Sequence, residues 1–111
     1  KDLWVKRVIG LPKETISYKD GVLYVNDKPI EEPFLDKAYV EQVKKELQLP
    51  YFTQDIEPVT LKENEYFLMG DNRNSSMDSR NVGAFTRGKI IAKGMFVYYP
   101  FDSMHYVSNG K

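Results

Sequence analysis

The sequence contains no cysteine and only one histidine, His105, in 111 residues. The absence of cysteine excludes disulfide bonds, thiolate nucleophiles and zinc sites built on thiolates. A single histidine leaves almost no material for imidazole metal sites or for a Ser-His catalytic pair. No apolar run approaches the roughly 18 residues of a membrane-spanning helix, and no signal peptide is visible.

An excess of charge of either sign is also lacking. Sixteen Lys and Arg residues balance sixteen Asp and Glu residues, so the formal net charge is zero and we expect no nucleic-acid partner. The hydrophobic fraction of 41% and the aromatic fraction of 14% indicate a folded chain. We expect one domain over residues 1–111. Because the chain begins on Lys1 rather than on methionine, we also expect it to be a piece of a longer protein.

Short runs of β-branched and aromatic residues predict a mainly β fold. Residues 3–10 form one expected strand, and Asp-Gly at 20–21 predicts a hairpin between residues 15–18 and 22–25. Strand character returns at residues 59–69, around a turn at 63–65. The apolar residues 88–101 are interpreted as C-terminal strands, interrupted at Gly94 by a bulge or bend.

Helical spacing of apolar residues occurs in one segment, residues 36–47, for which we predict a short amphipathic helix. Residues 49–58 show little sign of regular structure. The predicted fold is therefore a small domain of antiparallel sheets, barrel-like or sandwich-like, with hairpin extensions and at most a short helix. Residues 15–58 form its hairpin and an insertion.

The segment 70–83 is a dense polar loop that directly follows an apolar strand. Its Asp71, Arg73, Asp78 and Arg80 can form bidentate Asp–Arg pairs that hold the loop rigid. The simplest interpretation is a charged connector that does nothing else. Calcium binding is disfavoured because the alternating ligand pattern would make Arg73 a ligand, and we predict no metal.

Two further side chains are candidates for chemistry. In a strand, Lys6 shares an apolar face with Trp4 and Val8, so its ammonium can extend to the rim, pair with an acid, or lose its proton through a lowered pKa. A neutral lysine can serve as a general base for a hydroxyl nucleophile. Ser76 can orient such an amine, act as a nucleophile itself, or merely satisfy loop backbone.

Residues 70–83 match every fixed position of the Gly-Asp-Asn-Arg-x-x-Ser-x-Asp-Ser-Arg-x-x-Gly box of bacterial type I signal peptidases. Residues 3–12 resemble the lysine box of that family, in which Lys-Arg precedes Gly-Leu-Pro. Residues 23–29, 32–35 and 96–101 are similar to other family segments, in the family's order. One departure is Lys13-Glu14, where the family usually has Gly-Asp, and we expect it to alter the turn after the lysine strand.

The resemblance implies a Ser-Lys endopeptidase that removes signal peptides from exported preproteins, with no metal and no cofactor. Lys6 would be the catalytic base and Ser76 would orient it. The resemblance also implies two supporting groups of residues: a buttress for the loop (Asp71, Asp78 and Arg80) and a substrate-binding strand (Leu3, Trp4 and Val5). The strand would pair with an extended substrate and accept small side chains, as in an Ala-x-Ala cleavage site.

The family carries its nucleophilic serine in a Ser-Met-x-Pro motif before the lysine box, whereas the first serine here is Ser17. We therefore expect the nucleophile and the membrane anchor to lie outside this chain, which would be inactive alone unless a companion fragment binds it. The whole protein would act at the outer face of the cell membrane. The alternatives are a non-catalytic remnant that binds peptides and another Ser-Lys hydrolase, such as a self-cleaving repressor.

Overall fold

The computed structural model describes residues 5–73 and 78–98, and the backbone of residues 104–105. In chain order, its strands and helices are β1 (Val5–Gly10), β2 (Thr15–Lys19), β3 (Val22–Val25), β4 (Lys28–Ile30), α1 (Lys37–Leu47), β5 (Ile56–Thr60), β6 (Glu65–Met69), α2 (Ser79–Val82), β7 (Phe85–Thr86), α3 (Arg87–Ala92), β8 (Phe96–Tyr98) and β9 (Met104–His105).

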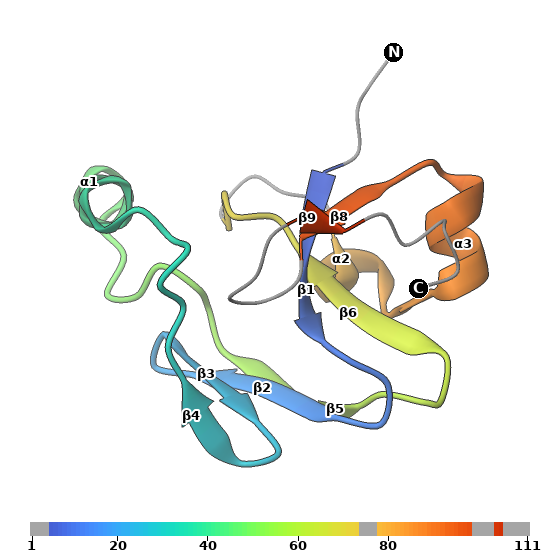
Figure 1. Ribbon diagram of the computed structural model, residues 1–111. Coiled ribbons are helices and arrows are strands. Elements are labelled where there is room, and N and C mark those ends of the chain that lie inside the picture. Colours follow the sequence, from blue (N-terminus) through green and yellow to red (C-terminus); the bar gives the residue numbers. More distant parts are fainter. Residues whose placement is uncertain (1–4, 74–77, 99–103, 106–111) are drawn as a thin grey trace.

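The strands form two sheets, which confirms the mainly β prediction. The larger sheet has the order β7-β6-β1-β8-β9, and the smaller has the order β4-β3-β2-β5. All pairs are antiparallel except β1 with β8, which run parallel. Figure 1 shows the smaller sheet below the larger one, with α1 standing apart from α3 on the opposite side of the molecule.

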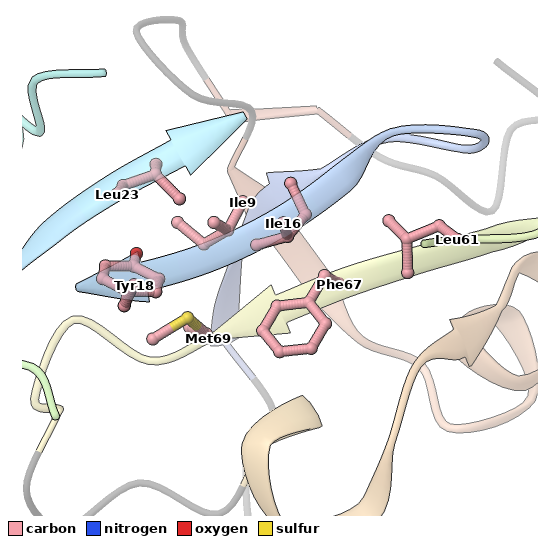
Figure 2. Close-up of a cluster of buried hydrophobic side chains, with 7 residues drawn as sticks. All are labelled: Ile9, Ile16, Tyr18, Leu23, Leu61, Phe67 and Met69. Carbon is pink, nitrogen blue, oxygen red and sulfur yellow. The ribbon is translucent and has the colours of Figure 1, made fainter. Parts of the chain in front are cut away.

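Two core clusters lie on opposite faces of β1 and β6, because side chains alternate along a strand. The first core cluster consists of Val8, Leu68, Phe85, Ile90, Met95 and Val97. The second core cluster, drawn in Figure 2, consists of Ile9, Ile16, Tyr18, Leu23, Leu61, Phe67 and Met69. The strand β1, which carries Lys6, therefore has one core cluster packed against each of its two faces.

The predicted hairpin is confirmed, with Lys19 opposite Val22 in the register of β2 and β3. Its two turn residues, Asp20 and Gly21, have φ values of 53° and 80°. Positive φ at both central positions is the geometry of a type I′ turn, which matches the twist of the flanking strands.

The predicted helix is confirmed as α1. Asp36 caps its N-terminus by accepting hydrogen bonds from the backbone N–H groups of Ala38 and Tyr39. Gln48 ends it in the left-handed conformation, with φ 56°. Only Val43 is buried within the helix, so α1 is attached to the rest of the chain by a narrow apolar stripe.

The interpretation of residues 88–101 as strands is wrong in its first half. Residues 87–92 form the helix α3, because the Thr86 hydroxyl accepts a hydrogen bond from the N–H of Lys89 and caps the N-terminus. The break at Gly94 is confirmed, with φ 62°. The strand prediction is confirmed for residues 96–98, which form β8, and residues 99–101 lie outside the described residues. A short apolar run does not distinguish a buried helix from a strand.

Two other expectations need correction. Residues 49–58 are not entirely irregular, because β5 begins at Ile56 and pairs with β2. With α2 and α3, the described residues also contain more than one short helix. The strands on either side of the turn at residues 63–65 join different sheets, β5 the smaller and β6 the larger.

Candidate functional site

Lys6 lies on the face of β1 that packs onto the first core cluster. It shares this face with Val8 and lies beside Val97 in the parallel register with β8, and both of these valines are fully buried. Burial lowers the pKa of Lys6 below its ordinary value of 10.5; Asp78 opposes that shift through its charge, and Arg80 adds to it. Lys6 therefore gives up its proton more readily than an exposed lysine does.

Asp78 and Arg80 form an ion pair that organises the end of the polar loop. Arg80 donates from Nε to Oδ1 of Asp78 at 2.9 Å and from Nη2 to Oδ2 at 2.8 Å. Asp78 is fully buried, and it also accepts from the N–H of Gly70 at 3.0 Å. Burial alone would raise the pKa of Asp78, but these hydrogen bonds outweigh it and hold the pKa below its usual range.

Asp78 is also the N-cap of α2. Its side chain accepts from the N–H of Arg80 at 3.0 Å, while the Asn81 side chain accepts from the N–H of Asp78 at 3.0 Å. This reciprocal arrangement is a capping box. One carboxylate thus joins the start of the loop, at Gly70, to the helix that ends it.

Asp71 does not pair with an arginine of its own loop, as the sequence suggested. Instead, it accepts two hydrogen bonds from Arg7 of β1, at 3.0 and 2.9 Å. The Arg7 guanidinium also lies 3.8 Å from the ring centroid of Phe34 and 5.3 Å from that of Tyr98. The strand that carries Lys6 is therefore tied directly to the loop, through the residue that follows Lys6.

Arg73 is buried and anchors the loop to the smaller sheet. It donates from Nη2 to Glu32 at 2.9 Å, and from Nη1 to the hydroxyls of Tyr18 at 3.1 Å and Thr53 at 3.0 Å. Its Nε donates to the carbonyl of Gly70 at 2.8 Å. Burial alone would lower the pKa of Arg73, but Tyr18 and Glu32 raise it above its ordinary value. The guanidinium therefore stays charged inside the protein.

A cleft of about 300 Å³ opens beside Lys6. It is lined by Val5, Lys6, Arg7, Asp71 and Tyr98. The register of β1 with β6 ends at Arg7 opposite Met69, so among the described residues no strand pairs with β1 at Val5 on that side. Val5 is 43% exposed. A larger cavity of about 440 Å³, between residues 52–56 and the polar loop, does not include Lys6.

The structure describes five of the eight site residues predicted from sequence. Lys6, Asp78 and Arg80 are brought together electrostatically, and Val5 and Asp71 line the cleft with Lys6. Leu3, Trp4 and Ser76 lie outside the described residues. Glu32 and Phe34, which contact Arg73 and Arg7, were not predicted as site residues, and the only signal for them in the sequence is the similarity of residues 32–35 to a family segment.

Metal-ligating side chains do not gather in the part of the chain that the structure describes: no group of three or more His, Cys, Asp or Glu residues there could hold an ion. Within residues 5–73, 78–98 and 104–105, no helix has the length and apolar character needed to cross a bilayer.

Comparison with known proteins agrees with the resemblance carried by residues 3–12 and 70–83. Residues 1–99 match the family described as signal peptidase, peptidase S26. Signal peptidase I S of Bacillus subtilis (strain 168) is 45% identical over 102 residues, which cover 91% of this chain and 54% of that protein. A signal peptidase I of Bacillus amyloliquefaciens is 44% identical over 103 residues, with the same two coverages.

A crystal structure of a signal peptidase I from Enterococcus faecalis V583 has a similar fold, with a TM-score of 0.63 and 36% sequence identity. The match covers 76% of this chain and 75% of that one. The chain spans about half the length of the curated relatives it matches. The family match over residues 1–99 and the shared fold lead to one conclusion: the chain belongs to the signal peptidase family, peptidase S26.

Proposed function

We propose that this chain supplies the general base of a Ser-Lys endopeptidase that cleaves signal peptides from exported preproteins. One observation carries the proposal: Lys6, an amine with a lowered pKa, lines an open cleft, and the charges of the Asp78–Arg80 pair act on it. The curated relatives are named signal peptidases, and a lysine with a lowered pKa more often has the neutral amine that can take the proton of a serine hydroxyl.

In the proposed reaction, the neutral amine of Lys6 takes the proton of a serine hydroxyl as its oxygen attacks the scissile carbonyl. The lysine then gives a proton to the departing amine as the peptide C–N bond breaks, which leaves an acyl-enzyme. Water, deprotonated by the same lysine, attacks the ester carbonyl; the bond to the serine oxygen breaks, the lysine returns the proton to that oxygen, and the signal peptide is released as a carboxylate. The serine is expected from a segment outside this chain, because Ser17 is the first serine here.

The proposed substrate strand lies along β1. An extended signal peptide would pair with the backbone at Val5, on the side where the described part of β6 has ended. Leu3 and Trp4 are proposed to continue this surface and to accept the small side chains of an Ala-x-Ala site. The whole protein would hold this surface at the outer face of the cell membrane, through an anchor outside the chain.

The test compares the complete protein, its two Lys6 variants and the 111-residue chain on one signal-peptide substrate. The complete protein should cleave it, and Lys6→Met and Lys6→Arg should both abolish turnover, because neither side chain can accept a proton near neutral pH. The 111-residue chain alone should not cleave. Turnover by the purified chain would overturn the assignment of the nucleophile, and binding without cleavage by the complete protein would support the peptide-binding alternative.

Ser76 has a separate test. Ser76→Ala in the complete protein should lower kcat about 10- to 100-fold, because loss of an orienting hydrogen bond is costly but leaves the nucleophile in place. Ser76→Thr, which keeps the hydroxyl, serves as the control. Near-complete loss in Ser76→Ala, equal to that of Lys6→Met, would instead identify Ser76 as the nucleophile.

A further inference from the structure

The segment 32–34, which follows β4, contacts both elements that carry the proposed site. Glu32 accepts a hydrogen bond from Arg73 of the polar loop at 2.9 Å. Two residues later, the ring of Phe34 lies 3.8 Å below the guanidinium of Arg7 on β1. Residues 32–34 belong to neither sheet, so regular structure does not account for these two contacts.

Glu32 compensates a charge that could not otherwise be buried. The side chain of Arg73 is fully buried, and that of Glu32 is only 9% exposed. The Tyr18 hydroxyl donates to the same Glu32 oxygen at 2.7 Å, and no described buried polar side-chain atom lacks a partner. Removal of the carboxylate would leave a buried guanidinium without its counter-charge, which is strongly unfavourable.

The position of Arg73 is transmitted to the groups that act on Lys6. The carbonyl of Arg73 accepts a hydrogen bond of 2.7 Å from Nη1 of Arg80, and Arg80 holds Asp78. Asp78 and Arg80 both act on Lys6 through their charges. A displacement of Arg73 would therefore move both charges beside the proposed base.

Phe34 acts on the other side of Lys6. The planar guanidinium of Arg7 stacks on its ring, a favourable cation–π geometry, and the same guanidinium holds Asp71 by two hydrogen bonds. Arg7 follows Lys6 directly in β1, and both residues line the cleft. The stacked ring thus fixes the orientation of Arg7, and with it the distance between the strand and the loop.

We propose that Glu32 and Phe34 are positioning residues of the catalytic site: the segment 32–34 clamps the polar loop through Arg73 and the lysine strand through Arg7. The proposal rests on the proposed function, since it assigns a purpose to the alignment of Lys6 with the loop. A purely structural role would predict loss of stability alone, whereas a positioning role predicts a change in the behaviour of Lys6.

The kinetic test uses the complete protein and the variants Glu32→Gln, Phe34→Leu and Phe34→Trp. Glu32→Gln should lower kcat about tenfold with KM changed less than about twofold, because alignment in the transition state is lost rather than binding. Phe34→Leu should lower kcat about fivefold, a size typical of one cation–π contact. Phe34→Trp retains a ring face and should recover activity to within about twofold of the parent protein.

The pH profile of kcat/KM separates positioning from stability. A loosened clamp lets water reach Lys6, so the acidic limb should shift to higher pH in both Glu32→Gln and Phe34→Leu. In Glu32→Gln the displacement of Arg80 should raise the pKa of Lys6 further. Asp78 opposes that shift because its departure lowers the pKa of Lys6, but burial is the larger cause. NMR titration of labelled lysine in the same variants should show the same upward shift of the Lys6 pKa.

Two control variants lie outside the clamp and the site. Val43→Ala reduces the packing of α1, and Glu41→Gln removes an exposed ion pair with Lys44. Neither should move the acidic limb. If Glu32→Gln and Phe34→Leu leave kcat and the limb at the values of these controls, the clamp is only structural and the proposal is wrong. If Glu32→Gln does not fold, the two Phe34 variants decide the question.

The failure of the clamp and the failure of the proposed function give different results. A parent protein without cleavage activity contradicts the proposed function, but the NMR titration of Lys6 still tests the clamp. An unchanged Lys6 pKa in all variants contradicts the clamp even where the parent protein cleaves normally.

Discussion

Burial lowers the pKa of Lys6, which favours its role as a base, but the same burial makes folding less favourable. An ammonium that loses part of its water on folding is destabilising, and its pKa falls because the neutral form is preferred inside the protein. Below the lowered pKa the amine is charged in both folded and unfolded states, so the full penalty applies. The penalty decreases as pH rises from the folded pKa towards 10.5.

Lys6→Met tests this balance. The variant keeps the apolar stem but has no charge, so in urea unfolding its midpoint should exceed that of the parent chain at pH 6. The difference should narrow as pH approaches 10. Lys19→Met, at a lysine whose side chain is 70% exposed, should change the midpoint little at either pH. A lower midpoint for Lys6→Met at pH 6 would show that the Lys6 charge stabilises the fold.

Lys13 shows how one substitution within the family pattern is accommodated. The residue has φ 75°, in the left-handed region that glycine adopts more freely. The turn is held instead by Glu14, whose side chain accepts from the N–H of Leu11 at 2.8 Å and whose carbonyl accepts from the N–H of Leu61 at 2.9 Å. The backbone at Lys13 thus has a conformation suited to glycine, and Glu14 supplies the hydrogen bonds that hold the turn.

At the scale of elements, the polar loop depends unequally on its two aspartates. The side chain of Asp78 is fully buried and bonded to Arg80, Gly70 and the start of α2, whereas that of Asp71 is 45% exposed. A buried pair that loses one partner leaves an uncompensated charge, while an exposed pair contributes little. The loop should therefore tolerate changes at its beginning better than at its end.

Asp78→Asn should lower the free energy of unfolding by about 3 kcal/mol at pH 7, and Asp71→Asn by less than about 1 kcal/mol. The pKa of Asp78 in the folded state lies below its ordinary value of 3.8. The stabilisation of the fold by the Asp78 carboxylate is therefore fully present above pH 3.8. It is lost as pH falls through the folded pKa. The difference in free energy of unfolding between the parent and Asp78→Asn, measured with urea, should shrink below pH 4. Equal losses of stability in Asp78→Asn and Asp71→Asn would contradict this account.

The helix α3 replaces an expected strand, and its N-cap can be tested. Thr86→Ala removes the hydroxyl that accepts from Lys89 N–H at 3.2 Å and should cost about 1 kcal/mol in thermal or urea unfolding. Thr86→Ser retains the cap and should remain close to the parent. An unchanged stability in Thr86→Ala would indicate that packing of Ile90, rather than the cap, determines the helix.

At the scale of the whole molecule, the two sheets meet where β1 ends. Gly10 lies at the end of β1, next to a bulge between Val8 and Gly10 in the pairing with β6. A Cβ at Gly10 would lie 2.5 Å from Ile16 Cγ1 and 2.9 Å from Leu61 Cδ1. Both neighbours belong to the second core cluster, so the junction leaves no space for a side chain.

Gly10→Ala should therefore lower the free energy of unfolding by about 1–3 kcal/mol through overpacking. Gly88→Ala is the matched control, because a Cβ there meets nothing within 4 Å and alanine favours the helix α3. It should stabilise the chain by about 0.5–1 kcal/mol. A Gly10→Ala variant as stable as the parent would show that the two sheets can move apart at little cost.

The sequence predicted those features that depend on neighbouring residues. The Asp-Gly turn, the helix capped by Asp36 and the break at Gly94 follow from local backbone preferences. The strand of Lys6 follows from alternation of apolar residues. Residues 88–92 form a helix rather than the predicted strand because Ile90 and Ile91 suit either structure, and the Thr86 cap favours the helix.

The partners of the arginines were beyond the reach of sequence, because pairing across 64 or 41 positions depends on how the chain folds back. Asp71 pairs with Arg7 rather than within its loop, and Arg73 pairs with Glu32. Proximity in sequence suggested ion pairs inside the loop, and of the four charged residues only Asp78 and Arg80 form one. They can do so because both lie at the start of α2, where the Asp78 side chain caps the helix.

By itself, the sequence determined the family pattern, the absence of thiol chemistry and the presence of a lysine on an apolar strand face, because these depend on residue types and short spacings. Only the tertiary structure decided which charges surround Lys6, where the cleft opens, and that residues 32–34 contact both the strand and the loop. The physical reason is that burial and pairing of charge arise between segments far apart in the chain, after two sheets have packed around β1 and β6.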